Sequence, residues 1–153
     1  MRLQTEADVN HQRLEQAKRL GADIMFSPTD IDPVEAILEL IAGVGVDCCL
    51  ETSGAASARS AAIRATKTWG TACFVGEGGE VKINVSPELL RKQMTVIGSW
   101  TFSITGQSEC ACFVASKGID VGQVYTHRWS PDQAEEAFRL FDRGVGGKGV
   151  FLL

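Results

Sequence analysis

Apolar residues follow two alternating patterns along the chain of 153 residues. Where they recur every three to four positions they predict helices, and these ranges are 10–20, 33–42, 57–67, 86–90, 107–117 and 130–143. Where they form short continuous runs they predict strands buried on both faces, and these ranges are 24–26, 46–50, 72–75, 95–99 and 148–153. Alternating strands and helices favour an α/β fold, with a mostly parallel sheet of about four strands flanked by helices.

Capping residues support the ends of the predicted helices. Asn10 precedes the first helix, and Asp32 with Pro33 precedes the second, which is a typical helix start. Ser130 and Gln133 have the spacing of a capping box. Two later helices are expected to turn their apolar residues inward, and these residues are Cys110, Phe113 and Val114 in one helix and Ala134, Ala137, Phe138 and Phe141 in the other.

Composition excludes several classes of protein. The chain is 44% hydrophobic and 22% charged, which is typical of a globular protein. Its net charge of −4 comes without acidic or basic blocks, so we expect neither a nucleic-acid partner nor a membrane surface. Because residues 1–6 lack the apolar stretch of a signal peptide, a cytoplasmic location is expected.

The five cysteines are interpreted as unpaired. Cys48, Cys49 and Cys73 lie in apolar runs, where a thiol packs like a small hydrophobic side chain. Cys110 and Cys112 are two positions apart on a predicted helix and therefore point to different faces, which makes a poor chelate. The sequence therefore predicts neither a disulfide nor a metal site.

Five segments in a fixed order resemble the C-terminal half of the zinc-dependent medium-chain dehydrogenase/reductase family, on its alcohol and polyol dehydrogenase side. The segments are 13–23, 45–54, 70–76, 91–100 and 134–150. The resemblance implies a partial NAD-binding, Rossmann-like domain over 1–119 and a segment returning to the family's catalytic domain over 120–153.

The resemblance is incomplete at its start. A Rossmann unit opens with a strand, a G-x-G-x-x-G turn and a helix, and no such unit is predicted here. The glycines of 43–45 and of 76–79 are interpreted as turns. The family's zinc ligands lie in its other domain, so zinc is expected of the family and not of this chain, and no catalytic or metal-binding residue is predicted.

The resemblance implies two residues beside the adenosine ribose of NAD. Asp8 occupies the place of an acid that accepts the ribose hydroxyls and disfavours the extra phosphate of NADP. Arg13 matches a basic position along the same ribose. The alternative is that Asp8 is a solvated acid near a helix start, because residues 1–7 are polar and unlike the expected strand.

Three turns at the ends of predicted strands are further candidates for contact with NAD. Open α/β sheets bind ligands at the carboxyl ends of their strands, and the resemblance implies this role for Thr52, Ser53 and Gly54, for Val75, Gly76 and Glu77, and for Gly98, Ser99 and Trp100. The alternative is ordinary turn chemistry. Glu51 is expected to be buried and paired, and neither His11 nor His127 is given a catalytic role.

Three functions remain open. The chain is a fragment of an NAD-dependent alcohol or polyol oxidoreductase that is inactive alone, or one half of a split dehydrogenase completed by a separate N-terminal half, or a self-associating interaction module. In the last case, two copies of the chain form a homodimer through the edge of strand 95–100, as the resemblance implies. The sequence leaves open whether the chain by itself is an enzyme.

Overall fold

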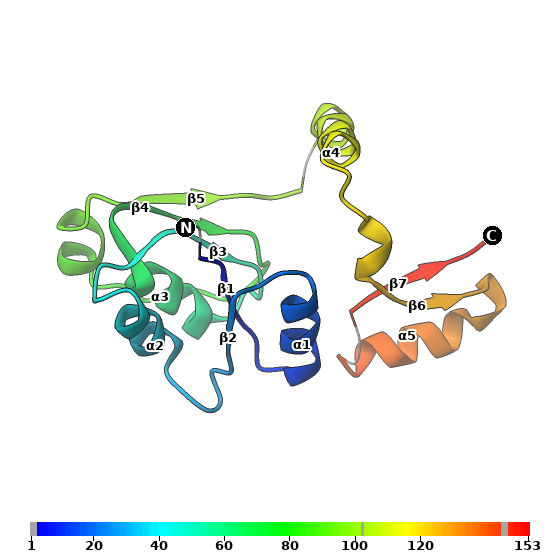
Figure 1. Ribbon diagram of the computed structural model, residues 1–153, viewed down its shortest axis with the longest axis horizontal. Coiled ribbons are helices and arrows are strands. Elements are labelled where there is room, and N and C mark those ends of the chain that lie inside the picture. The colour runs from blue at the N-terminus through cyan, green and yellow to red at the C-terminus, as the bar shows by residue number, and fades with distance from the viewer. Residues whose placement is uncertain (1–2, 102, 145–146) are drawn as a thin grey trace. The chain divides into compact units, whose positions relative to one another are not determined.

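The structure is a computed structural model that describes residues 3–101, 103–144 and 147–153 (Figure 1). It divides into two compact units, one formed by Met1–Ser27 with Phe102–Leu153 and the other by Pro28–Thr101. The predicted α/β class is confirmed, since all strand pairs among the described residues are parallel. The expected single sheet of about four strands is wrong, because the strands form three sheets of two, three and two strands.

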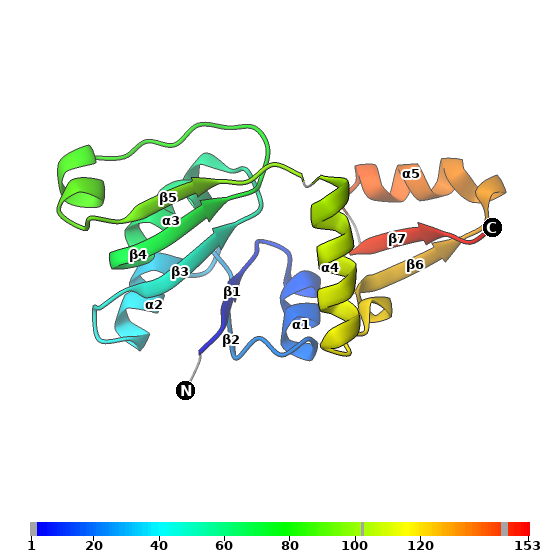
Figure 2. The ribbon, with the colours of Figure 1, turned by 90° about the horizontal axis from the view of Figure 1, so that it is seen from above.

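The unit of residues 28–101 is built on the three-stranded sheet, whose order is β3-β4-β5 (Figure 2). Its elements are α2 (Pro33–Leu40), β3 (Val46–Glu51), α3 (Ala56–Ala65), β4 (Thr66–Phe74), the short π-helix η1 (Ser86–Leu90) and β5 (Thr95–Gly98). As predicted, Asp32 caps α2 by accepting the amides of Val34 and Glu35. Helices α2 and α3 lie on the same side of the sheet (Figure 1).

Small side chains allow α3 to pack closely on the sheet. Ala62, Ile63 and Ala65 are buried, and Ala72 of β4 is fully covered. The other face of the sheet is open, and Leu50 there is 65% exposed. The prediction of strands buried on both faces is therefore wrong for β3, and Cys48 is exposed on the face that α3 does not cover.

The second unit contains a β-α-β segment near the N-terminus, formed by β1 (Thr5–Ala7), α1 (His11–Arg19) and β2 (Ile24–Phe26). Asn10 caps α1 by accepting the amide of Gln12, as the sequence predicts. Strand β1 was not expected, because its residues are polar. It forms because Thr5 to Ala7 pair in parallel with β2, so backbone hydrogen bonds take the place of apolar side chains.

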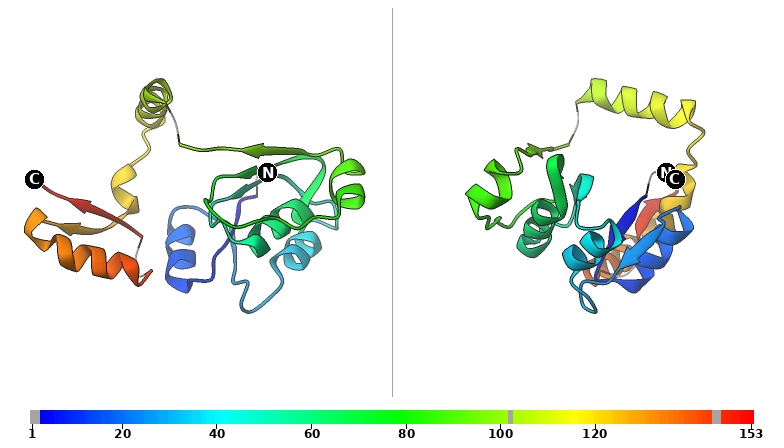
Figure 3. Two further views of the ribbon diagram at one scale, coloured as in Figure 1. Left: turned by 180° about the vertical axis from the view of Figure 1, so that it is seen from behind. Right: turned by 60° about the vertical axis from the view of Figure 1, so that its left-hand side comes forward.

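The same unit contains α4 (Ile104–Ser116), the 3₁₀ helix η2 (Val121–Val124), β6 (Tyr125–Trp129), the 3₁₀ turn η3 (Pro131–Gln133), α5 (Ala134–Asp142) and β7 (Lys148–Phe151). Strands β6 and β7 pair in parallel, and α5 lies along them (Figure 3). Trp129 is the centre of this part, because it is buried against the rings of Phe141 and Phe151.

Two predicted apolar faces are wrong in part. Cys110 and Phe113 of α4 are exposed, because the apolar residues of this helix are spread around its circumference and none of them is buried. Phe138 of α5 is 70% exposed, whereas Ala137 is buried. The contact face of α5 runs through Ala137 and Phe141, four positions apart, and Phe138 points away from it.

None of the described helices is long and apolar enough to cross a bilayer. All five cysteines lie in the described part of the chain, and none forms a disulfide.

Candidate functional site

The three predicted turns meet at the carboxyl edge of the β3-β4-β5 sheet. Where β3 ends, the carbonyl oxygen of Glu51 accepts the amides of Val75 and Gly76, at 2.8 and 3.1 Å. Where β4 ends, the carbonyl oxygen of Phe74 accepts the amide of Ser99, at 2.9 Å. The structure therefore brings turns 52–54, 75–77 and 98–100 together in this order along one edge.

The first two turns touch through their backbones. A Cβ atom on Gly54 would lie 2.0 Å from the carbonyl oxygen of Glu77, and one on Gly76 would lie 2.1 Å from the nitrogen of Gly54. Gly79 is similarly close, since its Cβ would lie 2.3 Å from the carbonyl oxygen of Gly54. Glycine is required at these positions because any side chain would push the two turns apart.

The third turn is more open than the other two. Nothing lies within 4 Å of a Cβ built on Gly98, and the ring of Trp100 is 66% exposed. Its glycine therefore leaves room at the sheet edge, where a ring or a ribose could approach the backbone.

Glu51 is the buried acid of this edge. One carboxylate oxygen, Oε1, accepts the amide of Ser53 at 2.7 Å, its hydroxyl at 2.5 Å and the amide of Gly54 at 2.9 Å. Burial raises the pKa of Glu51, but these hydrogen bonds and the nearby charge of Arg59 outweigh it and lower the pKa overall. Glu51 is therefore a carboxylate that fixes the backbone of the first turn.

Sequence reasoning missed Arg59 altogether. This residue of α3 lies with its Nε 3.6 Å from Oε2 of Glu51, and its Nη2 donates to the carbonyl oxygen of Gly76 at 2.6 Å. Its guanidinium carbon lies 5.8 Å from the centre of the Phe74 ring. An arginine one turn into a helix that follows a strand-end acid is the only signal in the sequence that could have indicated it.

Asp8 and Arg13 lie in the other compact unit and are described separately. Asp8 follows β1 directly, so the expected strand before the acid is present. Its Oδ1 accepts the amide of Asn10 at 2.8 Å, and its Oδ2 lies 3.6 Å from Nη1 of Arg13. The Asp8 side chain is 26% exposed and therefore remains accessible. In the same unit, burial of Glu6 raises its pKa, and the nearby negative charge of Asp8 raises that pKa further.

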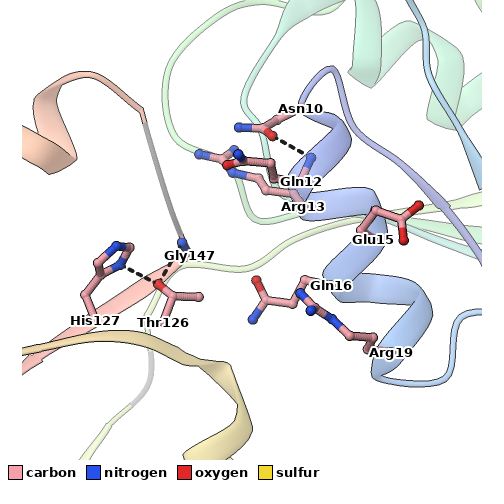
Figure 4. Close-up of a pocket in the computed structure, with 9 residues that line it drawn as sticks. All are labelled: Asn10, Gln12, Arg13, Glu15, Gln16, Arg19, Thr126, His127 and Gly147. Carbon is pink, nitrogen blue, oxygen red and sulfur yellow. Dashed lines mark hydrogen bonds between the residues drawn. The ribbon is translucent and has the colours of Figure 1, made fainter.

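A polar cavity of about 320 Å³ lies beside α1 (Figure 4). Its lining comes from α1 and from the β6–β7 pair and consists of Asn10, Gln12, Arg13, Glu15, Gln16, Arg19, Thr126, His127 and Gly147. Thr126 ties this wall together, since its hydroxyl oxygen accepts the amide of Gly147 and lies 2.8 Å from Nδ1 of His127. His127 stacks on Trp129 and belongs to the packing of β6.

The described residues contain neither a cluster of metal ligands nor a G-x-G-x-x-G turn that leads from a strand into a helix. Among residues 3–101, 103–144 and 147–153, no group of three or more His, Cys, Asp or Glu side chains is arranged to hold a metal ion. The spacing G-x-G-x-x-G does occur once, at 144–149, although the sequence analysis expected none. It follows helix α5 and runs into strand β7, which includes residues 148 and 149; this is the reverse of the strand-to-helix order that binds a dinucleotide.

Comparison with known proteins identifies the family. Residues 5–116 match the family described as zinc-binding dehydrogenase. The chain belongs to the zinc-binding dehydrogenase family. The match covers both segments that carry the candidate residues, from Asp8 to the turn at 98–100.

Named relatives support this assignment to the zinc-binding dehydrogenases. The chain is 35% identical over 144 residues to an uncharacterized zinc-type alcohol dehydrogenase-like protein, YphC, of Escherichia coli K12, and the match covers 94% of this chain. It is 32% identical over 149 residues, covering 92% of this chain, to an L-threonine 3-dehydrogenase of Pyrococcus abyssi. The matches span only 40% and 41% of these two relatives.

Solved structures of zinc-binding dehydrogenases show the same fold. A putative zinc-binding dehydrogenase from Clostridium scindens superposes with a TM-score of 0.86 at 21% identity, covering 97% of this chain and 42% of that one. The predicted Rossmann-like fold is therefore confirmed, as the C-terminal part of a longer architecture.

Proposed function

We propose that this chain provides the dinucleotide-binding half of an NAD-dependent oxidoreductase that acts on an alcohol or polyol, and that it is inactive alone. The observation that carries the proposal is the set of three strand-end turns held side by side at the carboxyl edge of a parallel sheet. This is the edge at which open α/β sheets bind ligands.

The candidate residues of each compact unit are proposed to bind a different part of NAD. The accessible carboxylate of Asp8 accepts hydrogen bonds from the ribose hydroxyls, and Arg13, whose Nη1 lies 3.6 Å from Oδ2 of Asp8, flanks the same ribose. The turns at 52–54 and 75–77 contribute glycine backbone that a ring can approach, and the turn at 98–100 adds the exposed Trp100. Within each compact unit, the chemistry of these residues supports contact with the part of the dinucleotide named.

NAD, when bound, supplies the hydride acceptor of the oxidation. The protein residues in this proposal bind and orient it, and none of them moves a proton of the substrate. The described residues do not fit a catalytic zinc ion, so we assign no step through zinc to this chain. Turnover then needs groups that another polypeptide or another part of the protein supplies.

Isothermal titration of the chain of 153 residues with NAD and with ADP-ribose tests the proposal. We expect saturable binding that Asp8→Asn weakens about tenfold, because the variant loses charge-assisted hydrogen bonds to the ribose. Glu39→Gln, which removes an exposed carboxylate of α2, is the matched control and should bind as the parent does. With NAD and a panel of alcohols and polyols, we expect no NADH.

Two outcomes would contradict the proposal. Absence of saturable binding up to millimolar NAD would remove the cofactor role. Formation of NADH by the purified chain would instead show that the chain is active alone, and that it contains catalytic residues.

A second candidate function is self-association through β5. This strand is at the edge of its sheet, since it pairs with β4 and the sheet order ends there. Its side chains are exposed, and Val96 and Ile97 are 42% and 45% accessible. An edge strand with exposed apolar side chains pairs readily with another strand, so we propose a homodimer that joins two β5 edges.

Sedimentation velocity over a range of protein concentrations tests this dimer. We expect a dimer that Ile97→Lys converts to a monomer, because a charge at the edge opposes strand pairing. Val44→Lys, which alters another exposed apolar residue of the same unit, should leave the dimer intact. A parent chain that stays monomeric throughout would refute the interface.

A further inference from the structure

The carboxylate of Glu51 is buried, although Thr52 and Ser53, which follow it in the chain, are exposed. Its side chain is 3% exposed, and Oε1 alone accepts all three hydrogen bonds from the turn. The second oxygen, Oε2, is buried, and no described group donates to it. A carboxylate in this position needs a compensating positive charge.

Arg59 supplies that charge and also reaches the second turn. Its side chain is 12% exposed, and its Nε is buried without a hydrogen-bond acceptor among the described residues. Nε lies 3.6 Å from Oε2 of Glu51, while Nη2 donates to the carbonyl oxygen of Gly76 at 2.6 Å. One guanidinium therefore connects the acid of the first turn with the backbone of the second.

The contact between the two turns involves backbone atoms only, so no side chain in the contact fixes the distance between the turns. Gly54 and Gly76 meet backbone to backbone, and Gly79 closes on the carbonyl oxygen of Gly54. Because glycine has no side chain, no side-chain groups interlock across this contact, and the backbone of glycine is conformationally free. Two interactions hold the turns together. The amides of Val75 and Gly76 donate hydrogen bonds to the carbonyl oxygen of Glu51, and Arg59 bridges Glu51 and Gly76.

We propose that Glu51 and Arg59 are positioning residues that lock the turns at 52–54 and 75–77, together with Gly79, into one rigid surface, and that this surface receives the adenosine part of the dinucleotide. The second half of the statement rests on the proposed function. Neither side chain touches the ligand, and both act through the backbone of the turns.

Amide hydrogen exchange of the whole chain, measured residue by residue by NMR, tests the lock without a ligand. Arg59→Met should speed exchange at Ser53, Gly54 and Gly76 by about tenfold or more, since it removes one charge-assisted bond and the counter-charge of Glu51. Arg59→Lys keeps the charge but has a single donor group, so it should restore part of the protection. Arg64→Met, on the exposed side of the same helix, is the matched control and should change nothing at the turns.

Two results would overturn the lock. Unchanged exchange at Ser53, Gly54 and Gly76 in Arg59→Met would show that the glycine contact holds itself. An equal loss of protection at the core residue Ala72 would show general loss of stability instead of local positioning. Comparison with Glu51→Gln, which keeps an acceptor oxygen for the turn, checks that the effect requires the charge pair.

Titration of the same variants with NAD separates this inference from the proposed function. If the parent chain binds NAD, Arg59→Met should raise the dissociation constant about tenfold, and Arg64→Met should not alter it. Equal affinity of parent and Arg59→Met would overturn the role in binding even where exchange changes. If the parent does not bind NAD, the proposed function and the binding role fail together, and hydrogen exchange alone decides the lock.

Discussion

Single residues set two tight contacts in this protein, one at the turns of the candidate site and one around Trp129. A Cβ on Gly149 would lie 2.5 Å from Cζ3 of Trp129 and 2.6 Å from Cε2 of Phe141. Glycine at this position of β7 therefore lets two rings close over the strand. The packing of β6, α5 and β7 therefore depends on a residue without a side chain at position 149.

Substitution of that glycine should loosen the aromatic cluster. We expect Gly149→Ala to lower the free energy of unfolding by about 1–3 kcal/mol, because overpacking forces the rings apart. The measurement is urea denaturation followed by tryptophan fluorescence, since Trp129 is 8% exposed while Trp69 and Trp100 are 74% and 66% exposed. Gly98→Ala is the control, because its Cβ meets nothing within 4 Å, and equal stability loss in both variants would contradict the prediction.

The charge of Glu51 predicts a pH dependence of stability. Its pKa in the folded chain lies below the ordinary value of 4.5, so the unfolded state binds protons more readily. The stabilisation is complete above pH 4.5 and is lost as the pH falls through the folded pKa. Urea midpoints measured between about pH 6 and pH 3 should therefore fall more steeply in the parent than in Glu51→Gln. Parallel curves would show that Glu51 titrates as in the unfolded chain.

At the scale of elements, α3 ends in an unusual cap. Nζ of Lys92 donates to the carbonyl oxygens of Ile63, Arg64 and Thr66, at 3.0, 2.8 and 2.7 Å. These are carbonyls at the C-terminal end of a helix, where a positive charge is favourable. Burial lowers the pKa of Lys92, with a smaller opposing effect of Glu88. The cap fixes where α3 stops and β4 starts.

Removal of this cap should destabilise the unit of residues 28–101. We expect Lys92→Met to cost about 1–3 kcal/mol, because three carbonyl oxygens, two of them in part-buried hydrogen bonds, lose their charged donor. Thermal and urea unfolding of both variants measure the loss. Lys82→Met is the matched control, since the Lys82 side chain is 86% exposed and its Nζ lies 3.4 Å from Oε1 of the exposed Glu80. A loss of less than about 0.5 kcal/mol in Lys92→Met would mean that water replaces the lysine.

Elements with local signals could be predicted from the sequence, and elements that depend on distant partners could not. Asn10 and Asp32 cap their helices as expected, because a cap is decided within three residues. Strand β1 is not predicted from the sequence, because backbone hydrogen bonds to β2 form it and its polar side chains give no strand pattern. The exposure of Phe113 could not be predicted, because it depends on what packs against α4.

The candidate site shows the same division. The turns at 52–54, 75–77 and 98–100 are predicted from the ends of apolar runs together with the family resemblance, and the structure puts them on one edge of the sheet. The role of Arg59 was not found, because its partner atoms lie on Glu51 and Gly76, eight and seventeen positions away. Sequence patterns locate strand ends, while the side chains that hold them together become visible only in three dimensions.

At the scale of the whole molecule, the proposed cofactor should couple to stability. A ligand that binds only the folded state stabilises it by about 2.7 kcal/mol at a concentration of one hundred times its dissociation constant. We therefore expect NAD to raise the melting temperature of the chain, and NADP at the same concentration to raise it less. The reason is that the extra phosphate of NADP meets the carboxylate of Asp8.

Differential scanning calorimetry with both nucleotides measures this preference. Asp8→Asn should reduce the difference between the melting-temperature increases caused by NAD and by NADP. Glu39→Gln should leave that difference unchanged. Equal shifts with the two nucleotides in the parent chain would remove Asp8 as the residue that selects between them.

The backbone contact between Gly54, Gly76 and Gly79 also limits how loop length can vary at this sheet edge. Because the atoms of one turn fill the space beside the other, adding or deleting one residue in either turn would move these three glycines out of contact. The extended stretch 80–84, mostly exposed, has no such constraint. Insertions and deletions among related chains should therefore fall after residue 79, and a library of insertions would find its tolerant positions there.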